Sequence, residues 1–217
     1  MRSWIETNDG SLSLYVDELD ETYHSRHGAV TESLHVFIEN GLNQFANNSD
    51  VNILEVGFGT GTNCMLTISE ALNRKVYYRA LEPKPLTPIE WSRVIELGMP
   101  LIDNKFLKAI VSCTSHTKLS ESFDLEIIKS TLQEAALEPN SIDLIYYDAF
   151  GPRAQPEMWT VDCFQKLYNC MKTGGILVTY CAKGQVRRDL KSCGFEMERL
   201  PGPPGKREML RATKVGS

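Results

Sequence analysis

The stretch Ile53-Leu54-Glu55-Val56-Gly57-Phe58-Gly59-Thr60-Gly61 decides the fold of this 217-residue sequence. A short apolar run typical of a buried strand leads into alternating glycines, which predict a tight turn at the start of a helix. Glycine lets the backbone turn sharply and approach a ligand closely, because it has no Cβ. A dinucleotide site needs its third glycine one position later, where this chain has Thr62. The spacing therefore argues against a nicotinamide dehydrogenase.

The pattern Glu-x-Gly-x-Gly-x-Gly resembles the signature of class I S-adenosylmethionine methyltransferases. The resemblance implies that the cofactor loop is formed by Glu55, Gly57, Gly59 and Gly61. It also implies an acidic residue at the end of the next strand, where a carboxylate accepts both ribose hydroxyls of the adenosine. Glu82 follows the predicted strand Val76–Leu81 and lies 27 residues after Glu55. Together these features predict S-adenosylmethionine as the cofactor.

The adenine contact is expected after the third strand of the core. Many methyltransferases carry an aspartate there, whereas Ile127-Ile128-Lys129-Ser130-Thr131-Leu132-Gln133 contains none. Backbone groups near Thr131 and Leu132, or the side-chain amide of Gln133, are the candidate contacts for the base edge. We therefore take Leu132 as a candidate cofactor-binding residue.

The remaining pattern predicts an α/β fold of the Rossmann-like methyltransferase class, with a mostly parallel seven-stranded sheet, helices on both faces and an antiparallel C-terminal strand pair. The predicted core strands are Asn52–Val56, Val76–Leu81, Asp124–Ile128, Ile142–Tyr147 and Gly175–Cys181. The predicted core helices are Gly61–Asn73, Pro88–Leu97, Leu132–Ala136, Met158–Met171 and Gly184–Cys193. The last two strands, Gly194–Arg199 and Lys206–Thr213, are joined by a Pro- and Gly-rich loop.

The N-terminal part predicts an extension packed on this core. Apolar and polar residues alternate on both sides of Asn8-Asp9-Gly10, which predicts a β-hairpin, and Ala29–Phe45 has helical spacing. We expect residues 1–50 to form this extension and residues 51–217 to form the methyltransferase domain. The turn that contains Tyr23, His24, Ser25 and Glu32 is expected to fold over the cofactor pocket.

Composition narrows the class of protein further. No segment has the 18 or more consecutive apolar residues of a membrane span, and the start lacks the apolar region of a signal peptide, so we expect a cytoplasmic protein without membrane contact. The six cysteines and four histidines lack metal-site spacing, so no metal is expected. The net charge of −5 divides into +5 over residues 183–214 and −10 over the remainder. The basic segment is suited to phosphates.

Asp148 is the candidate catalytic residue. It follows the predicted strand Ile142–Tyr147, and ligand sites in open α/β sheets gather at the carboxyl ends of strands. Methyl transfer needs a lone pair aimed at the methyl group, and an amine must first be neutral. A carboxylate that accepts an N–H bond orients the amine and takes its proton. Asp148 is thus placed near both the cofactor and the amine, although a turn or capping role would also account for it.

Four stretches in order are similar to the methyltransferase domain of the bacterial bifunctional enzymes that synthesise 5-methylaminomethyl-2-thiouridine in tRNA. They are Thr31-Glu32-Ser33 with Val36-Phe37-Ile38, the glycine loop, Asp148-Ala149-Phe150 with Pro152, Pro156 and Met158-Trp159, and Gly205-Lys206-Arg207-Glu208-Met209. The resemblance implies methylation of the primary amine of 5-aminomethyl-(2-thio)uridine at the tRNA wobble position. It makes the anticodon stem-loop the expected partner.

Further expectations follow from this resemblance. Phe150 and Trp159 would form an apolar or stacking wall for the uracil, with core packing as the equal alternative for Trp159. Lys206 and Arg207 would contact the substrate. The FAD-dependent oxidase domain of the bifunctional enzymes is not expected in this chain, which would receive a nucleoside already bearing the aminomethyl group. A methyltransferase of the same fold acting on a small-molecule amine, and a cofactor-binding module without catalysis, remain alternatives.

Overall fold

The computed structural model describes residues 2–6, 12–23, 28–71, 73–97, 104–113 and 115–216. Its large sheet contains β4 (Val51–Val56), β5 (Val76–Leu81), β6 (His116–Ser120), β7 (Phe123–Ile128), β8 (Ile142–Tyr147), β9 (Met171–Thr179), β10 (Phe195–Pro201) and β11 (Glu208–Lys214). The strand order is β10-β11-β9-β8-β4-β5-β7-β6. The five central strands run parallel, and β11 is antiparallel to both of its neighbours. This confirms the predicted Rossmann-like class.

The sheet has eight strands rather than the predicted seven. The additional strand β6 pairs antiparallel with β7 at the edge of the sheet. Its sequence, His-Thr-Lys-Leu-Ser, is polar and its residues are exposed or partly exposed. An edge strand of this kind forms because its neighbour offers unpaired backbone groups, so the apolar pattern does not reveal it.

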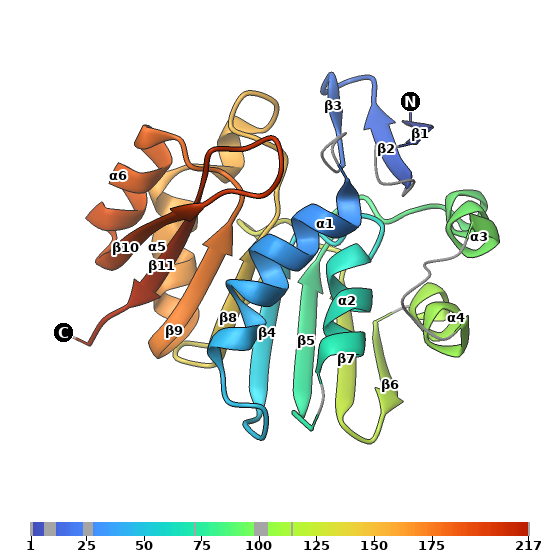
Figure 1. Cartoon of the computed structure of the whole chain (residues 1–217), viewed down its shortest axis with the longest axis horizontal. Coiled ribbons are helices and arrows are strands. Elements are labelled where there is room, and N and C mark those ends of the chain that lie inside the picture. The colour runs from blue at the N-terminus through green and yellow to red at the C-terminus, as the bar shows by residue number, and fades with distance from the viewer. Residues whose placement is uncertain are drawn as a thin grey trace.

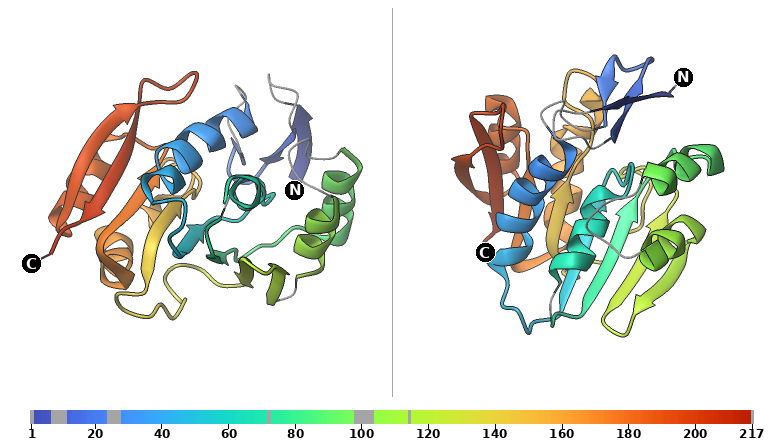
Figure 2. Two further views of the ribbon diagram at one scale, coloured as in Figure 1. Left: turned by 60° about the horizontal axis from the view of Figure 1, so that its bottom comes forward. Right: turned by 45° about the vertical axis from the view of Figure 1, so that its right-hand side comes forward.

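Helices cover both faces of the sheet (Figures 1 and 2). One face carries α1 (Ala29–Ser33), which continues as the π-helix η1 (Leu34–Glu39), and α2 (Thr62–Glu70), whereas α5 (Val161–Cys170) and α6 (Gly184–Ser192) lie behind the sheet in Figure 1. Two further helices, α3 (Pro88–Leu97) and α4 (Asn104–Ser112), lie toward the β6 end. Short 3-10 turns occur at η2 (Leu42–Gln44) and η3 (Pro156–Met158). None of the helices described is both long and apolar enough to cross a bilayer.

Several predicted helices differ from the structure. The segment predicted as a helix over Leu132–Ala136 is a turn, in which Ala135 N–H donates to the carbonyl of Thr131 without further helical elements. The predicted helix Met158–Met171 begins later, because Thr160 accepts from Cys163 N–H as an N-cap at 3.3 Å. Helix α4 was not predicted at all. The segment Ala29–Phe45 is divided among three helical types instead of one helix.

Helix α2 ends earlier than predicted, at Glu70. The buried guanidinium of Arg74 donates to the carbonyl of Glu70 at 3.2 Å and to the carbonyl of Phe45 at 2.9 Å. Cations at a helix C-terminus satisfy carbonyl groups that lack helical partners. Arg74 therefore ties the end of α2 to the chain that enters β4.

The N-terminal strands form a small second sheet above the carboxyl ends of the parallel strands (Figure 1). They are β1 (Arg2–Glu6), β2 (Leu12–Val16) and β3 (Glu21–Thr22), and the antiparallel pairing of β1 with β2 confirms the predicted hairpin strands. The predicted turn at Asn8-Asp9-Gly10 lies outside the described residues. Leu14 of β2 belongs to the same apolar cluster as Phe37 of η1 and Ile53 of β4. The small sheet is thereby joined to the core.

Candidate active site

A cavity of about 1160 Å³ lies between the small N-terminal sheet and the carboxyl ends of β4, β5 and β8. It is lined by residues from the glycine loop, the ends of the parallel strands and the N-terminal segment. The candidate residues on its wall are Gly57, Gly59, Glu82, Leu132, Asp148, Phe150 and Lys206. Glu55, Gly61, Trp159 and Arg207 are not on this wall. The predicted site thus divides into residues that face a ligand and residues that support them or lie elsewhere.

The glycine loop needs its glycines for both conformation and space. Gly57, Gly59 and Gly61 have φ values of 95°, 54° and 74°, in the left-handed region that favours glycine. A Cβ on Gly57 would lie 2.6 Å from the carbonyl oxygen of Asp148, and one on Gly59 would lie 2.7 Å from the ring of Tyr23. Gly61 is the N-cap of α2 and shapes the turn without facing the cavity. The loop leaves room for close approach of a ligand.

Glu82 directly follows β5, at the position expected for a ribose contact. Its Oε2 accepts from Gly59 N–H at 3.0 Å and its Oε1 accepts from Lys84 N–H at 2.9 Å. A carboxylate oxygen accepts more than one hydrogen bond, so each oxygen retains capacity for a ligand hydroxyl. The glycine loop and the Glu82 carboxylate together suit a nucleoside cofactor, with the carboxylate placed for the ribose hydroxyls.

Glu55 lies in β4, just before the glycine loop. It is fully buried, its Oε1 accepts from Asn63 Nδ2 at 2.9 Å, and its Oε2 accepts from the Tyr78 hydroxyl at 2.9 Å. Burial raises the pKa of Glu55 well above its usual range. Glu55 is not on the cavity wall and both of its oxygens have protein partners, which favours a supporting role, and a direct contact with the cofactor stays a prediction.

Asp148 lies at the end of β8 beside the glycine loop. Its Oδ2 accepts from the same Asn63 amide at 2.8 Å, so one side chain connects Glu55 and Asp148. Burial, followed by the charge of Glu32, raises the pKa of Asp148 to about 8, while the Asn63 hydrogen bond and the charge of Lys206 oppose this shift. A carboxyl group with such a pKa exchanges protons near neutral pH. Asp148 has the position and the acidity of a proton acceptor.

Aromatic side chains form the wall beside Asp148. Phe150 lines the cavity and packs edge to face against Tyr23 with ring centroids 5.1 Å apart. Trp159 lies behind this wall, where its indole N–H donates to the carbonyl of Phe150 at 2.7 Å and its ring packs against Tyr147. The structure therefore favours core packing for Trp159 over the stacking surface. Its indole N–H fixes the Phe150 backbone instead.

Lys206 and Arg207 point to different environments although they are neighbours. Lys206 Nζ pairs with Glu32 and lies 3.9 Å from the centroid of the Tyr180 ring, on the cavity wall. Arg207 is exposed to solvent. Of the expected turn over the pocket, Tyr23 and Glu32 line the cavity, whereas His24 and Ser25 lie outside the described residues.

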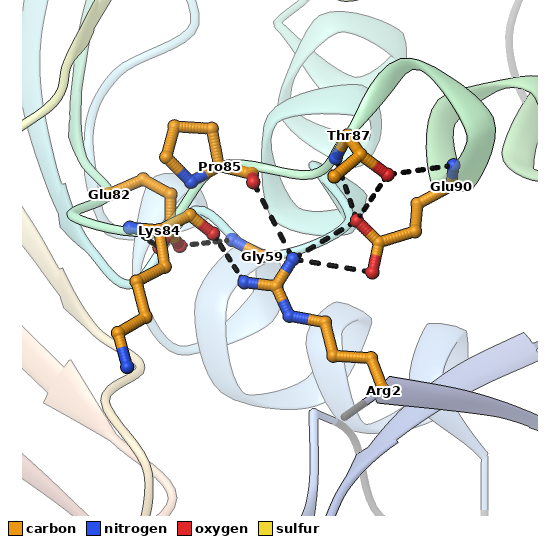
Figure 3. A network of polar contacts seen from close by, with 7 residues as sticks. All are labelled: Arg2, Gly59, Glu82, Lys84, Pro85, Thr87 and Glu90. Carbon is orange, nitrogen blue, oxygen red and sulfur yellow. Dashed lines mark hydrogen bonds and ion pairs between the residues drawn. The ribbon is translucent and has the colours of Figure 1, made fainter.

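The N-terminal strand is fastened to the segment after β5 by a polar network (Figure 3). The guanidinium of Arg2 donates to Glu90 Oε2 at 3.2 Å and to the carbonyls of Lys84 and Pro85. Glu90 also accepts from Thr87 N–H at 2.7 Å at the start of α3. Since Lys84 N–H donates to Glu82, the network reaches the carboxylate expected to hold the ribose. Arg2 thus connects the small sheet with the cofactor side of the cavity.

Only some of the candidate adenine contacts lie on the cavity wall. Ser130, Thr131 and Leu132 line the cavity, as the candidate contacts require. The Gln133 amide instead donates to the carbonyl of Glu157 at 3.0 Å and is not on the cavity wall. The structure therefore favours the backbone near Thr131 and Leu132 over Gln133 for the base edge.

Two residues of the site were missed in the sequence analysis. Asn63 lies in the first turn of α2, where its amide bridges two carboxylates, and Tyr180 follows β9 with its ring under Lys206. The position of Tyr180 directly after a strand was a usable signal, because ligand sites collect at such ends. Nothing in the local pattern around Asn63 indicates its two partners, which are 8 and 85 residues away.

Comparisons with known proteins agree with this geometry. A family described as "S-adenosyl-L-methionine-dependent methyltransferase" matches residues 101–215. Bifunctional tRNA 5-methylaminomethyl-2-thiouridine biosynthesis proteins MnmC are similar in sequence: that of Leptospira interrogans is 32% identical over 92% of this chain and 33% of its own length, and that of Cupriavidus metallidurans is 32% identical over 96% and 33%. This chain spans about one third of the length of these curated relatives.

Solved structures show the same fold. The crystal structure described as MNMC2 from Aquifex aeolicus superposes with a TM-score of 0.83 and 23% identity, over 100% of this chain and 72% of that chain. Spermidine synthase from Thermotoga maritima superposes with a TM-score of 0.62 and 14% identity, over 98% and 69%. At these identities the likeness concerns the fold alone. The chemistry of the site follows from its own residues.

Proposed function

This chain belongs to the S-adenosyl-L-methionine-dependent methyltransferase family, and we propose that it methylates the primary amine of 5-aminomethyl-(2-thio)uridine at the wobble position of tRNA. The observation that carries the proposal is the group of Asp148 and Glu32 at the end of the cavity beside the glycine loop, where a lysine ammonium already lies. Acidic groups that gather around a cation are suited to an amine substrate. The similarity to the named tRNA-modifying proteins supports uridine in tRNA as the bearer of that amine.

The cofactor half of the cavity is assigned to Gly57, Gly59, Glu82 and the backbone near Leu132. When bound there, S-adenosylmethionine supplies a methyl group on a positively charged sulfur. The glycine loop allows close approach, and Glu82 accepts the ribose hydroxyls. A positively charged group bound beside Asp148 would lower the pKa of its carboxyl group and would favour its charged form.

Asp148 prepares the amine in this proposal. An aminomethyl group is protonated near neutral pH and has no lone pair to offer, so a proton must leave before it reacts. The Asp148 carboxylate accepts that proton and keeps a hydrogen bond to the neutral amine, which orients the nitrogen lone pair. Asn63 fixes the rotamer of Asp148 through the hydrogen bond at 2.8 Å. Phe150 offers a flat apolar face for the uracil, and stacking of a base on an aromatic ring contributes about 1–3 kcal/mol.

The basic C-terminal segment supplies the surface for the rest of the tRNA. Lys183, Arg188 and Lys191 are exposed at and along α6, and Arg207 is exposed on the loop before β11. Arg211 does not belong to this surface, because its guanidinium donates twice to Glu198 at 3.0 Å. Lysine and arginine contacts to phosphates position a nucleic acid without reading its sequence. The uridine itself would be chosen in the cavity.

The test is to incubate the protein with methyl-labelled cofactor and bulk tRNA from cells that cannot make the methylaminomethyl group, and to digest the product to nucleosides. We expect label in 5-methylaminomethyl-(2-thio)uridine alone. Asp148→Asn is the matched variant, which should retain cofactor binding and lose at least a hundredfold in turnover, in line with the contribution of a positioned proton acceptor. Label in another nucleoside, or in free amines only, would contradict the tRNA substrate.

A further inference from the structure

Lys206 places an ammonium group inside the acceptor half of the cavity. Its Nζ pairs with Glu32 and lies 3.9 Å from the centroid of the Tyr180 ring, while its charge lowers the pKa of Asp148. The Tyr180 hydroxyl donates to the carbonyl of Ala149 at 2.8 Å, which fixes the ring beside the Asp148 loop. A carboxylate on one side and an aromatic face on the other are the two groups that bind alkylammonium ions most often in proteins.

Glu32 has capacity for another donor at this position. Its side chain is 12% exposed, and its Oε2 is buried without a hydrogen-bond partner among the residues that the structure describes. A buried charged oxygen without a partner is costly, so a donor that reaches it gains stabilisation. Lys206 uses Oε1 only. The carboxylate is therefore prepared for an ammonium ion with more than one N–H to donate.

The Lys206 side chain is able to rotate out of the cavity without a change in the backbone of its loop. Its backbone N–H donates to the carbonyl of Pro203 at 2.9 Å, and Gly202 N–H donates to the carbonyl of Arg207 at 3.1 Å, so the loop is held by its own hydrogen bonds. The Lys206 side chain is 31% exposed, which gives its ammonium a short path to water by rotation. Departure without replacement would leave the Glu32 carboxylate buried and unpaired, so only a cation replaces this lysine favourably.

We propose that the substrate ammonium binds between Glu32 and the ring of Tyr180 in the place of Lys206 Nζ, and that Glu32 is a substrate-binding residue. This inference rests on the proposed function, because it assigns the binding site of the amine that is to be methylated. Lys206 occupies the position of the substrate until the substrate arrives. An uncharged group at the same position of a uridine does not satisfy Glu32 and is rejected, which makes the exchange a source of specificity.

The direct test uses n-propylammonium, which corresponds to the part of lysine that Lys206→Ala removes. Lys206→Ala should bind this ion in calorimetric titration, whereas the wild-type protein, with its own ammonium in place, should bind it at least tenfold more weakly. The neutral analogue 1-propanol should not bind. Adding Glu32→Gln to Lys206→Ala should weaken binding at least tenfold. Equal binding by the single and double variants, or no binding by either, would overturn the proposal.

A second measurement needs no variant. If the substrate ammonium displaces Lys206 into solvent, an amine-acylating reagent should modify Lys206 faster when the aminomethyl nucleoside and S-adenosylhomocysteine are present than when they are absent. Mass spectrometry of the peptide measures the rate, with exposed Lys191 as the reference whose rate does not change. A slower or unchanged rate at Lys206 contradicts the exchange.

The outcomes separate this inference from the proposed function. If n-propylammonium binding depends on Glu32 but the protein methylates no tRNA, the ammonium site is supported and the tRNA substrate is contradicted. Conversely, Glu32→Gln could methylate tRNA with an unchanged KM while Lys206→Ala binds no n-propylammonium. This outcome would support the proposed function and contradict the ammonium site. Cofactor affinity, measured in both variants, verifies that the glycine-loop half of the cavity is intact.

Discussion

Asn63 connects two carboxyl groups of the candidate site through its side-chain amide. Its amide donates to the buried Glu55 and to Asp148, which lines the cavity. The charge of Asp148 is among the causes that raise the pKa of Glu55. Asn63, which is not on the cavity wall, thus connects Glu55 with the residue that we propose as the proton acceptor.

Asp148 should reduce the stability of the protein at alkaline pH. Its pKa is about 8 in the folded protein against 3.8 for an unperturbed carboxyl, so the folded state holds a proton that the unfolded state loses. The stability that this group contributes is full at acidic pH and is lost as pH rises toward 8. Asp148→Asn removes the loss, so we expect the variant to gain on the order of 4 kcal/mol over wild type at pH 9 relative to pH 5, which corresponds to about three pH units at 1.36 kcal/mol each.

Urea unfolding at pH 5 and pH 9 measures this difference. The exposed Asp50 provides the matched control, because Asp50→Asn should show nearly the same difference from wild type at both pH values. A pH-independent effect of Asp148→Asn would mean that the folded protein does not hold the proton. Together with the loss of turnover, a gain in alkaline stability would show that the carboxyl group is kept for chemistry at a cost to folding.

The neighbours of Asp148 should move the pH dependence of turnover in opposite directions. Glu32 raises the pKa of Asp148 and Lys206 lowers it. The rising limb of kcat/KM with pH, which reports the free enzyme, should therefore shift to lower pH in Glu32→Gln and to higher pH in Lys206→Met. Steady-state rates from pH 6 to 10 measure both shifts. Parallel shifts in the two variants would indicate that a group other than Asp148 controls the limb.

Among the secondary-structure elements, the sequence predicted the strands whose positions are determined by burial of apolar residues. β4, β5 and β8 are short apolar runs, and the rule that sites gather at carboxyl ends identified Glu82 and Asp148 correctly as cavity residues. Elements that depend on contacts with residues far away in the sequence could not be predicted. The polar edge strand β6 and the helix end set by Arg74 depend on contacts with residues that local patterns do not indicate.

The same distinction applies to the candidate site. For Trp159 the sequence left the substrate wall and core packing as equal alternatives, because the motif alone does not show which way an aromatic ring points. In the structure its N–H is satisfied by a carbonyl and its ring fills the core, so burial of a large apolar surface decides its place. Tyr180 escaped notice for the opposite reason, because the predicted strand was extended past Thr179 and absorbed it.

The attachment of β1 should contribute to cofactor affinity. Arg2 connects the small sheet to the segment that carries Glu82 (Figure 3). Its guanidinium carbon also lies 5.7 Å from the centroid of the Tyr23 ring. We expect Arg2→Ala to raise the Kd for S-adenosylmethionine about five- to thirtyfold, because a charge-assisted contact at a partly buried position is worth about 1–2 kcal/mol. Calorimetric titration measures the change.

Arg93→Ala is the control for this variant. Arg93 pairs with Glu96 at 2.7 Å on the exposed face of α3, so its removal deletes an arginine from the same region without loosening the small sheet. Exposed pairs of this kind contribute about 0–1 kcal/mol. Equal cofactor affinities in Arg2→Ala and Arg93→Ala would show that the attachment of β1 does not support the cofactor side.

For the whole molecule, charge is distributed unevenly along an acidic chain. The net charge of −5 includes +5 over residues 183–214, and the structure places Arg188 and Lys191 of that segment in solvent on α6. A basic segment in an acidic chain attracts polyanions to that segment. The proposed function assigns its exposed residues to tRNA phosphates.

Reversing these charges should weaken tRNA binding in a salt-dependent manner. Arg188→Glu with Lys191→Glu should reduce affinity, and the slope of log affinity against log salt concentration should flatten by about 0.7–0.9 for each phosphate that the variant no longer neutralises. Lys108→Glu with Lys118→Glu makes the same charge change on exposed residues at the β6 end of the sheet and should leave the slope nearly unchanged. Equal slopes in the two double variants would assign the α6 face to solvent.

Tyr23 joins the two halves of the cavity. Its ring lies against Gly59 of the cofactor loop and packs on Phe150 of the acceptor wall. A ligand that orders this ring in one half leaves less ordering to be done by a ligand in the other half, so the two should bind with positive cooperativity. Thermodynamic linkage then requires reciprocity: cofactor must tighten the binding of the acceptor by the same factor by which the acceptor tightens the binding of cofactor.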